Sequence, residues 1–357
     1  MDRRTTEFYE TRSAEYERGR EPRHQRRAEA FGQRRPAGIA IDLGSGPGWY
    51  TTSLGRPAIA LDGALAMVRR TREVAPHALG VQADLHALPF RRGALAAAWA
   101  RNTYVHLRAA DVPLALGDLH RSLAQDAPVE LTLFRGTDEG RGIFPGDDFP
   151  DRWFSTWPDE RLHDVIDGAG FTLDDLEVRH PDADEQGFRV CMTRGRMLPD
   201  TVGAGMRLLV SGLNPSLHAA DAGVGYVTAG NRFWPAALAA GLVSRDRDPR
   251  HALVHHGVGM TDLVKRATPR ADALTRDEYR TGVQRLDRLC AWLQPGAVCI
   301  VGLAGWRAAV DRHATAGWHE RQLGGRPVYV MPSTSGLNAA TPLAALVAHL
   351  QAAASGT

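Results

Sequence analysis

The feature that most constrains the fold is a short apolar run that ends at a turn. Residues 208–211 (LLVS) lead directly into GLNP at 212–215. A run of this length bounded by turn residues predicts a buried parallel strand followed by a loop. Residues 327–331 (PVYVM) repeat the pattern and lead into PSTSGL at 332–337. If both strands are parallel in one sheet, their loops share the edge where open α/β sheets bind ligands.

Five segments of the carboxyl-terminal half carry a family resemblance when taken together. They are GLNPS at 212–216, the loop around Tyr226, NRFW at 231–234, GVGMTDLV at 257–264 and MPSTSGLN at 331–338. In this order and spacing they resemble the mismatch-specific uracil/thymine DNA glycosylases, over nearly all of residues 205–354. The resemblance implies a three-layer α/β/α domain that acts in base-excision repair. Such an enzyme hydrolyses the N-glycosidic bond of uracil, thymine or 3,N4-ethenocytosine mispaired with guanine.

The resemblance also implies roles for three residues of the predicted pocket. The target base must first rotate out of the duplex into that pocket. Asn214 is the expected catalytic residue, whose amide would orient a water molecule beneath C1′. Tyr226 would stack on the base, and backbone N–H groups near Gly212 and Tyr226 would stabilise the departing anion. Because an amide is neutral, hydrolysis would depend on a leaving base that can carry negative charge.

The second loop is expected to contact DNA through Ser333, Thr334, Ser335, Gly336 and Leu337. Gly336 and Leu337 would enter the gap as an apolar wedge, as apolar side chains do where proteins unstack bases. Thr334 and Ser335 would bind the flanking phosphates. Asn338 and Ala339 stand where family members often carry an arginine that reaches the opposite guanine. This departure bears on mismatch preference, not on uracil excision.

Simpler interpretations of these residues remain open. Asn214 with Pro215 also fits an Asx-type turn, and Tyr226 fits an aromatic residue at the edge of the core. Asn231 and Arg232 fit residues that cap and anchor a helix instead of touching DNA. No lysine at the motifs suits Schiff-base chemistry, so a monofunctional glycosylase without a cofactor is expected. His255 and His256 have no partner cluster in the sequence, and no metal site is predicted.

The amino-terminal half contains its own strand and glycine-rich turn, GIAIDLGSGPGWYTTSL at 38–54. We predict a strand that closes at Asp42, a turn at Gly44, Gly46 and Gly48, and then a helix. Glycines let the backbone turn tightly and approach a ligand, as in the first turn of doubly wound sheets. A dinucleotide-binding dehydrogenase is the competing interpretation, although the third glycine comes sooner than in GxGxxG.

Three further segments bear on whether the glycine turn binds a dinucleotide or another nucleotide-like ligand. A second strand ends at Asp62, a third precedes Asp84, and residues 94–107 form a fourth strand and its exit loop. The series resembles class I S-adenosylmethionine-dependent methyltransferases of the type 11-like group, across about residues 8–197. The resemblance implies that the three glycines line the methionine and ribose and that Asp62 binds the ribose. It also implies that Asp84 faces the adenine, with Asn102 and Tyr104 near the reactive methyl.

The methyl acceptor stays unknown at this stage. The sequence contains neither an Asp-Pro-Pro-Tyr-like segment after the fourth strand nor a Pro-Cys nucleophile, which argues against DNA methylation. In this half we further expect a helix at 112–124, a strand at 129–134 and an acceptor-shaping loop at 135–157. Residues 1–36 predict a helical arm or lid, or else a solvated helix with internal ion pairs.

Glycine and proline at 197–206 predict a boundary between two domains. We expect a methyltransferase domain at 1–199 and a glycosylase domain at 205–357, both α/β and doubly wound. The second would be a parallel three-layer sandwich, with a strand at 297–302 and helices at 230–240, 277–293, 304–313 and 339–353.

Composition limits the class of protein. The three cysteines fit neither a disulfide framework nor a zinc site, and neither a membrane span nor a secretory signal is evident. A cytoplasmic location is therefore expected. We also expect a monomer. Of the 43 basic and 41 acidic residues, 16 and 10 lie in residues 201–357, a local surplus of six positive charges. That sign suits a phosphate-binding module. The resemblance implies that its partner is double-stranded DNA with a G·U or G·T mismatch.

Three hypotheses follow. The chain is a glycosylase fused to a methyltransferase of unknown acceptor, or a methyltransferase whose carboxyl-terminal domain only binds nucleic acid. Alternatively, it is a glycosylase whose amino-terminal domain is a degenerate scaffold. The intact set of Asp42, Asp62 and the three glycines argues against the last of these.

Overall fold

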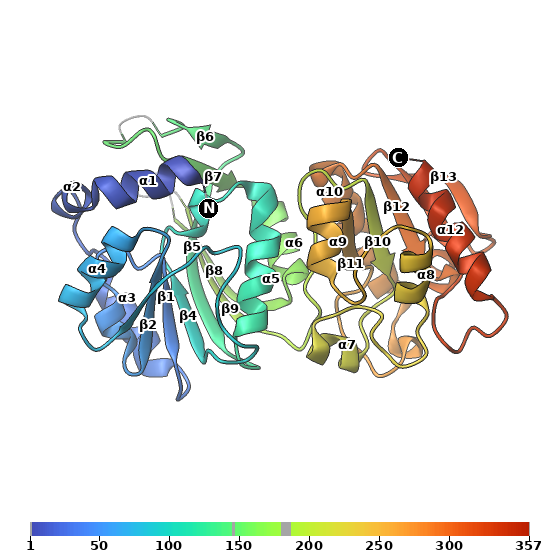
Figure 1. The fold of residues 1–357 in the computed structure, drawn as a ribbon, viewed down its shortest axis with the longest axis horizontal. Helices are drawn as coiled ribbons and strands as arrows, with labels where there is room; N and C mark the ends of the chain where they lie inside the picture. The colour runs from blue at the N-terminus through green and yellow to red at the C-terminus, as the bar shows by residue number, and fades with distance from the viewer. Residues whose placement is uncertain (1, 145–146, 180–186, 357) are drawn as a thin grey trace. The chain divides into compact units, whose positions relative to one another are not determined.

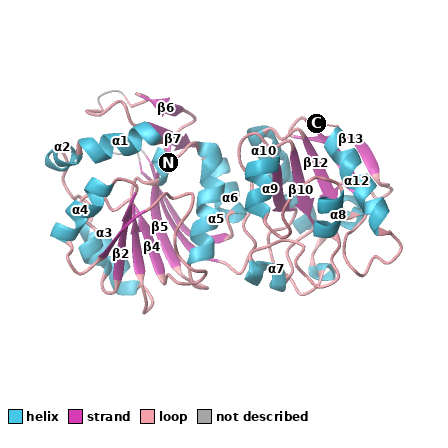
Figure 2. Cartoon of the chain, viewed as in Figure 1, coloured by secondary structure: helices cyan, strands magenta, loops and turns pink. Residues whose placement is uncertain are grey.

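The computed structural model describes residues 2–144, 147–179 and 187–356 of the chain (Figure 1). The chain divides into two compact units, each built around its own sheet (Figure 2). Unit 1 comprises residues 1–166 and 171–195, and unit 2 comprises residues 167–170 and 196–357.

The core of unit 1 is a parallel sheet whose strand order reverses once. The strands lie in the order β3-β2-β1-β4-β5. Their bounds are β1 Ala40–Leu43, β2 Ala58–Asp62, β3 Leu79–Gln82, β4 Ala97–Ala100 and β5 Pro128–Arg135. The chain runs outward from β1 to β3 and then returns to β4 on the other side of β1. The loops that leave β1 and β4 therefore diverge, and such a switch point is where open α/β sheets bind ligands.

Antiparallel strands extend this sheet beyond β5. They are β8 (Phe171–Arg179) and β9 (Gly187–Arg194), with β9 paired to β5. The stretch 135–157 is not the plain loop that the sequence suggests. It contains β6 (Glu139–Arg141) and β7 (Trp153–Trp157), which form an antiparallel pair. Residues 145–146 of that stretch lie outside the described part.

The helices of unit 1 are α1 Arg3–Thr11, α2 Ser13–Arg18, α3 Gln25–Arg34, α4 Leu65–Val74, α5 Val112–Ser122 and α6 Asp159–Gly168. The arm predicted at 1–36 is helical, but the solvated alternative is wrong. Phe8 is 7% exposed, and its ring centroid lies 4.9 Å from that of Phe149. The helix predicted after the glycine turn is also wrong, because only a 3₁₀ turn at Thr51–Leu54 follows.

The sheet of unit 2 has the order β11-β10-β12-β14-β13. The strands are β10 Leu208–Gly212, β11 Val258–Asp262, β12 Ala297–Val301, β13 Gly317–Leu323 and β14 Arg326–Met331. The first four in this order are parallel, so the loops after β10 and β14 do open at the same edge. The edge strand β13 is antiparallel to β14, which the expectation of a parallel sheet did not include.

Helices cover both faces of this sheet. The helices are α7 Leu217–Ala222, α8 Phe233–Ala239, α9 Pro249–His256, α10 Arg276–Leu293, α11 Leu303–Ala309 and α12 Leu343–Ser355. Buried residues of α8, α9 and α12 share one core with Leu208, Val210 and Cys299. The alternate strand residues, such as Leu209 and Ile300, are also fully buried. That second face is left to α10 and α11, which pack against each other.

Three of the helices predicted in unit 2 begin or end elsewhere. Helix α8 begins at Phe233 instead of residue 230. Helix α12 begins at Leu343 instead of residue 339, because residues 338–342 belong to the loop after β14. Helix α11 ends at Ala309 instead of residue 313.

Residues 197–206, predicted to be an interruption between domains, pack as part of unit 2. Asp200 is 3% exposed and binds Lys265 at 2.7 Å and Arg285 at 2.9 Å. Thr201 pairs with Met260 of β11 through backbone hydrogen bonds. Within the described residues, the helices are all too short or too polar to cross a bilayer.

Candidate functional sites

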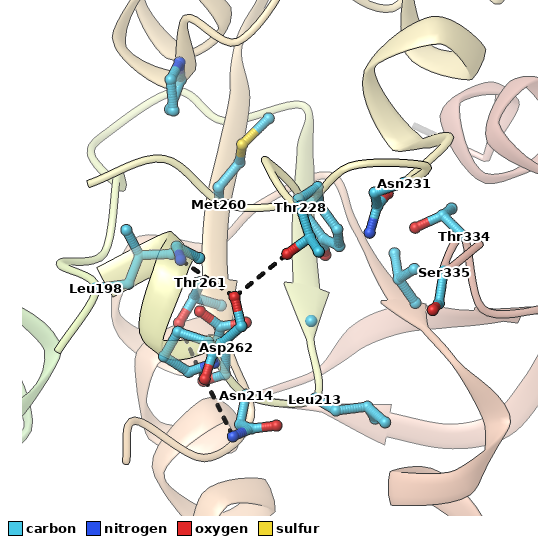
Figure 3. Close-up of a pocket in the computed structure, with 18 of the residues that line it drawn as sticks. Leu198, Leu213, Asn214, Thr228, Asn231, Met260, Thr261, Asp262, Thr334 and Ser335 are labelled. Carbon is cyan, nitrogen blue, oxygen red and sulfur yellow. Dashed lines mark hydrogen bonds between the residues drawn. The ribbon is translucent and has the colours of Figure 1, made fainter. Parts of the chain in front are cut away.

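Unit 2 contains a small pocket of about 220 Å³ at the carboxyl edge of its sheet (Figure 3). This volume is below the roughly 300–1,000 Å³ typical of sites for drug-sized ligands. The lining brings together most of the residues singled out in the sequence: Gly212, Asn214, Tyr226, Ser333, Thr334 and Ser335. Loops separated by more than 100 residues of sequence therefore meet at one cavity.

The Asn214 amide is held in one orientation by its neighbours. Its Nδ2 lies 2.7 Å from Thr268 Oγ1 and 3.1 Å from the backbone oxygen of Arg266, and also contacts the Pro215 oxygen at 3.2 Å. Carbonyl oxygens only accept, so the NH₂ group must face them. Asn214 Oδ1 then points the other way and is bonded to none of the described residues (Figure 3). The local Asx-turn interpretation is insufficient, because these contacts bridge more than 50 residues.

Tyr226 lines the pocket from a left-handed backbone conformation, with φ of 58°. One face of its ring stacks on Phe233, with centroids 4.1 Å apart and an interplanar angle of 20°. Its hydroxyl is buried without a hydrogen-bond partner among the described residues. Burial, followed by the nearby Asp262 carboxyl, raises the pKa of Tyr226 well above its usual value. Tyr226 is therefore both an edge of the core and a wall of the pocket.

Asp262, at the end of β11, is the acid that sequence reasoning missed. It is the one carboxyl group in the pocket lining and is 7% exposed. A Cβ on Gly212 would clash with Asp262 Oδ1 and approach the Tyr226 hydroxyl, so a larger residue there would displace the Asp262 carboxyl. Burial raises the pKa of Asp262 to about 6. The signal was present in the sequence, since a carboxylate that ends a strand parallel to β10 must lie at the same edge.

A buried ion network supports the base of this pocket. Asp200 accepts hydrogen bonds from Lys265, Arg285 and Thr261 at 2.6 to 2.9 Å. Burial alone would raise the pKa of Asp200, but Arg285 and Lys265 together bring it below its usual value. Arg285 also donates to the backbone oxygen of Asp262 at 3.0 Å. The network thereby fixes the strand end that carries the pocket acid.

The loop after β14 presents Leu337 to solvent. Leu337 is 97% exposed, the largest value among the exposed large apolar side chains of the described residues. Gly336 lies against Gly230, where a Cβ would come within 3.0 Å of the Gly230 oxygen. Thr334 is 1% exposed, which does not fit direct contact of its hydroxyl with a flanking phosphate. The hydroxyls of Ser333 and Ser335 accept hydrogen bonds from backbone N–H groups of the loop.

Unit 1 contains a much larger cavity, of about 1160 Å³, at the switch point between β1 and β4. Among the predicted cofactor residues, its lining includes Asp42, Gly44, Gly46, Asp62 and Asn102. Gly48 and Asp84 are not in the lining. Gly48 instead packs against Thr71, and Asp84 accepts hydrogen bonds from the backbone and ring of His86. Tyr104 is 1% exposed and also stands outside the lining.

The glycine turn has the shape of a cradle. Gly46 has φ of 53°, and the space its missing Cβ would fill is open. Asp62 accepts the backbone N–H of Gly46 at 3.0 Å and of Ala64 at 2.9 Å. Burial raises the pKa of Asp62 to about 6 and that of Asp42 to about 7. The open space at Gly46 and the adjoining carboxyl fit a ligand with a ribose and a positive charge, as S-adenosylmethionine has.

The lining of this cavity also contains aromatic rings: Tyr9, Tyr16, Phe134, Phe144 and Phe154. His106 joins them and was missed by sequence reasoning. Its Nε2 lies 3.0 Å from the Tyr9 hydroxyl, and its Nδ1 lies 2.7 Å from the Trp153 oxygen. Burial, and then the charge of Arg152, lower the pKa of His106 to about 3, so the ring is neutral at physiological pH.

Family comparisons agree with the division into two units. Residues 199–353 match the model of the uracil DNA glycosylase superfamily. Residues 41–129 match the model of a methyltransferase domain. The chain therefore combines a region similar to methyltransferase domains with a region similar to uracil DNA glycosylases.

Three solved structures similar to part of this chain illustrate the comparison, and the first two are described as methyltransferases. One is the 1,6-didemethyltoxoflavin-N1-methyltransferase of Burkholderia thailandensis, with 17% identity and a TM-score of 0.42, covering 54% of this chain and 87% of that one. A second is an S-adenosylmethionine-dependent methyltransferase from Methanosarcina mazei, with 13% identity and a TM-score of 0.40, covering 44% and 92%. A third is the DhpI complex with S-adenosylhomocysteine, with 18% identity and a TM-score of 0.42, covering 54% and 95%.

Proposed function

We propose that unit 2 is a monofunctional DNA glycosylase that acts in base-excision repair on bases mispaired with guanine. It would release uracil or 3,N4-ethenocytosine, and thymine weakly. The observation that carries this proposal is the orientation of Asn214. Thr268 Oγ1 and two backbone carbonyls hold its Nδ2, which leaves Oδ1 free to accept a hydrogen bond from water. The partner would be double-stranded DNA.

Asn214 and Asp262 would divide the chemistry between them. As the glycosidic bond breaks, the sugar becomes oxocarbenium-like and the pyrimidine gains negative charge. Asn214 Oδ1 would orient the attacking water. Asp262, with its pKa near 6, would be ionised at neutral pH and could take a proton from that water as a general base. A neutral amide would then not act alone, contrary to the expectation from the sequence.

Unit 2 also has the side chains that base rotation requires. Leu337 is an apolar side chain almost fully in solvent, which suits a wedge that fills the gap left by a rotated base. Tyr226, whose one face rests on Phe233, has its other face to offer the base. The pocket volume of about 220 Å³ suits a single base-sized group.

The only lysine of the chain cannot supply Schiff-base chemistry from its present position. Lys265 is 4% exposed and donates to Asp200 Oδ1 and to the backbone oxygen of Leu198. A buried amino group that already donates to these two oxygens is not positioned to attack a sugar carbon. We therefore expect hydrolysis without strand cleavage.

The test is incubation of the full chain with a labelled G·U duplex, followed by alkali to cleave abasic sites. The wild type should give an alkali-dependent product, and Asn214→Ala should lose about 10²–10³-fold in rate, by analogy with loss of one positioned polar group. DNA affinity should change little. His255→Ala, an exposed position on α9, is the matched control and should behave as the wild type.

Two results would contradict this assignment. If the wild type binds the duplex but yields no abasic product, unit 2 is a nucleic-acid-binding module only. If Asn214→Ala retains full activity, the water is held by another group.

Unit 1 supports a second activity, methyl transfer from S-adenosylmethionine to an acceptor. Gly44, Gly46, Asp62 and Asn102 would hold this cofactor, which supplies a methyl group on a positively charged sulfur. Asp62 accepts two backbone N–H groups and retains lone pairs for ribose hydroxyls. The match to a methyltransferase domain model supports this ligand over a dinucleotide.

The aromatic rings in the lining of this cavity favour a small planar methyl acceptor. Rings from α1, α2, β5 and β7 surround it, and stacking on aromatic faces selects flat molecules. Because His106 is neutral and buried, it can orient an acceptor through Tyr9 but gains a proton with difficulty.

Calorimetric titration with S-adenosylhomocysteine tests the cofactor assignment without knowledge of the acceptor. Binding should be micromolar or tighter in the wild type, and NAD should not compete. Absence of binding would identify unit 1 as a degenerate scaffold.

A further inference from the structure

The loop from residue 332 to residue 342, here called the wedge loop, lacks helix and strand yet carries Leu337 at its tip. A side chain that separates stacked bases must keep its position although restacking of the bases would push it out. The loop therefore needs rigidity from outside its own backbone.

Arg232 supplies contacts on both sides of that tip. Its Nη1 donates to the backbone oxygen of Thr341 at 2.5 Å. Its Nη2 donates to the oxygens of Asn338 at 2.5 Å and Ser335 at 3.3 Å. Its own backbone N–H donates to the oxygen of Thr334 at 2.9 Å. One residue thus ties carbonyls before and after Leu337 to a single guanidinium.

These bonds make Arg232 dedicated to the wedge loop. Among the described residues no carboxylate pairs with Arg232, and its side chain donates to carbonyl oxygens of this loop. Hydrogen bonds from a charged donor are roughly twice as strong as neutral ones. A rigid planar fork that holds several acceptors is a role that lysine reproduces only in part.

Arg232 also stands next to the base pocket. The following residue, Phe233, begins α8 and stacks on Tyr226 at 4.1 Å. The preceding residue, Asn231, accepts the Phe233 N–H at 2.9 Å and lines the pocket. Phe233, which packs against Tyr226, is therefore adjacent in sequence to Arg232, which holds the wedge loop.

We propose that Arg232 is a positioning residue for base rotation, which holds the wedge loop so that Leu337 enters the duplex while Tyr226 receives the base. This inference rests on the glycosylase function proposed above. Arg232 acts before the chemical step and touches neither the base nor the water. Its loss should slow rotation of a paired base and leave hydrolysis of an unpaired base intact.

The experiment compares single-turnover uracil release from two substrates, a G·U duplex and the same strand with uracil in a three-nucleotide unpaired bubble. Arg232→Ala should be about 10- to 100-fold slower on the duplex, as expected for loss of several charge-assisted hydrogen bonds. It should stay within about twofold of the wild type on the bubble. Arg232→Lys should fall between the two on the duplex.

Arg326→Ala is the matched control. Arg326 likewise donates to backbone carbonyls, those of Pro295 and Gly296, but at the start of β14 instead of its end. It should leave the duplex-to-bubble ratio unchanged. The second readout is the fluorescence of 2-aminopurine placed beside the uracil. This fluorescence should increase when the Asn214→Ala variant binds the duplex. It should increase far less when the double variant, Asn214→Ala with Arg232→Ala, binds.

Equal loss of Arg232→Ala activity on both substrates, or no loss on either, would overturn the proposal. If the wild type does not process the bubble, the 2-aminopurine signal decides. The proposal is then overturned if Arg232→Ala leaves the fluorescence increase seen with Asn214→Ala unchanged. Failure of the glycosylase function looks different, because the wild type would then release uracil from neither substrate.

Discussion

In both units the candidate site lies at the carboxyl ends of parallel strands, but the residues that form it differ. In unit 1 the turn after β1 is a glycine cradle beside two buried carboxyls, and the cavity is about 1160 Å³. In unit 2 the loop after β10 carries a single oriented amide, and the pocket is about 220 Å³. The difference shows that the switch point supplies a location only, and the side chains at it decide the chemistry.

The sharpest test of this difference is the acid in the smaller pocket. Asp262→Asn should lower uracil release by about 10²–10⁴-fold if Asp262 is a general base. Because burial raises the pKa of Asp262 to about 6, the wild-type rate should rise with pH through about 6 and then level off. The measurement is single-turnover release between pH 5 and 8. A wild-type profile that is flat across pH 6 would leave Asn214 as the sole catalytic group.

The next effect concerns stability. Asp200→Ala leaves Lys265 and Arg285 buried without their shared carboxylate, so unit 2 should lose about 3–5 kcal/mol of unfolding free energy. Urea unfolding followed by tryptophan fluorescence measures this. Asp221→Ala, which removes a half-exposed pair with Arg196, is the control and should cost under about 1 kcal/mol. Equal losses in the two variants would mean that the network does not support the pocket.

A smaller effect tests unit 1 alone. Asp62→Asn should weaken S-adenosylhomocysteine binding by about 10- to 100-fold, since one charged hydrogen-bond acceptor is lost. Uracil release should be unaffected if the two units act independently. Calorimetry on the full chain measures S-adenosylhomocysteine binding, and the duplex assay measures uracil release. Unaltered binding would place the ribose elsewhere in the cavity.

The smallest effect is at Tyr226. Its hydroxyl is buried without a partner, so Tyr226→Phe should keep or raise stability by about 1 kcal/mol and keep most of the activity. Tyr226→Ala should lose activity on both duplex and bubble substrates, because the stacking wall is gone. A loss in Tyr226→Phe as large as in Tyr226→Ala would assign a chemical role to the hydroxyl.

Local pattern predicted the strands well. The runs at 208–211, 297–302 and 327–331 became β10, β12 and β14, since short apolar runs bounded by turns have few alternatives in an α/β chain. Helix ends were less predictable. Residues 339–342 have helix-compatible composition but lie in the wedge loop, whose carbonyls at Asn338 and Thr341 bind Arg232 instead. That preference depends on a residue about 100 positions earlier.

Chain order and residue type were enough to show that there are two α/β units and that Asn214, Tyr226 and Leu337 deserve study. Three-dimensional packing decided the surroundings of those residues. It turned the Asn214 Nδ2 toward Thr268, brought Asp262 against Gly212, buried Thr334 and left Gly48 and Asp84 out of the cavity lining. The physical reason is that strand periodicity is encoded within a few residues, whereas orientation and pKa depend on neighbours that only folding brings near.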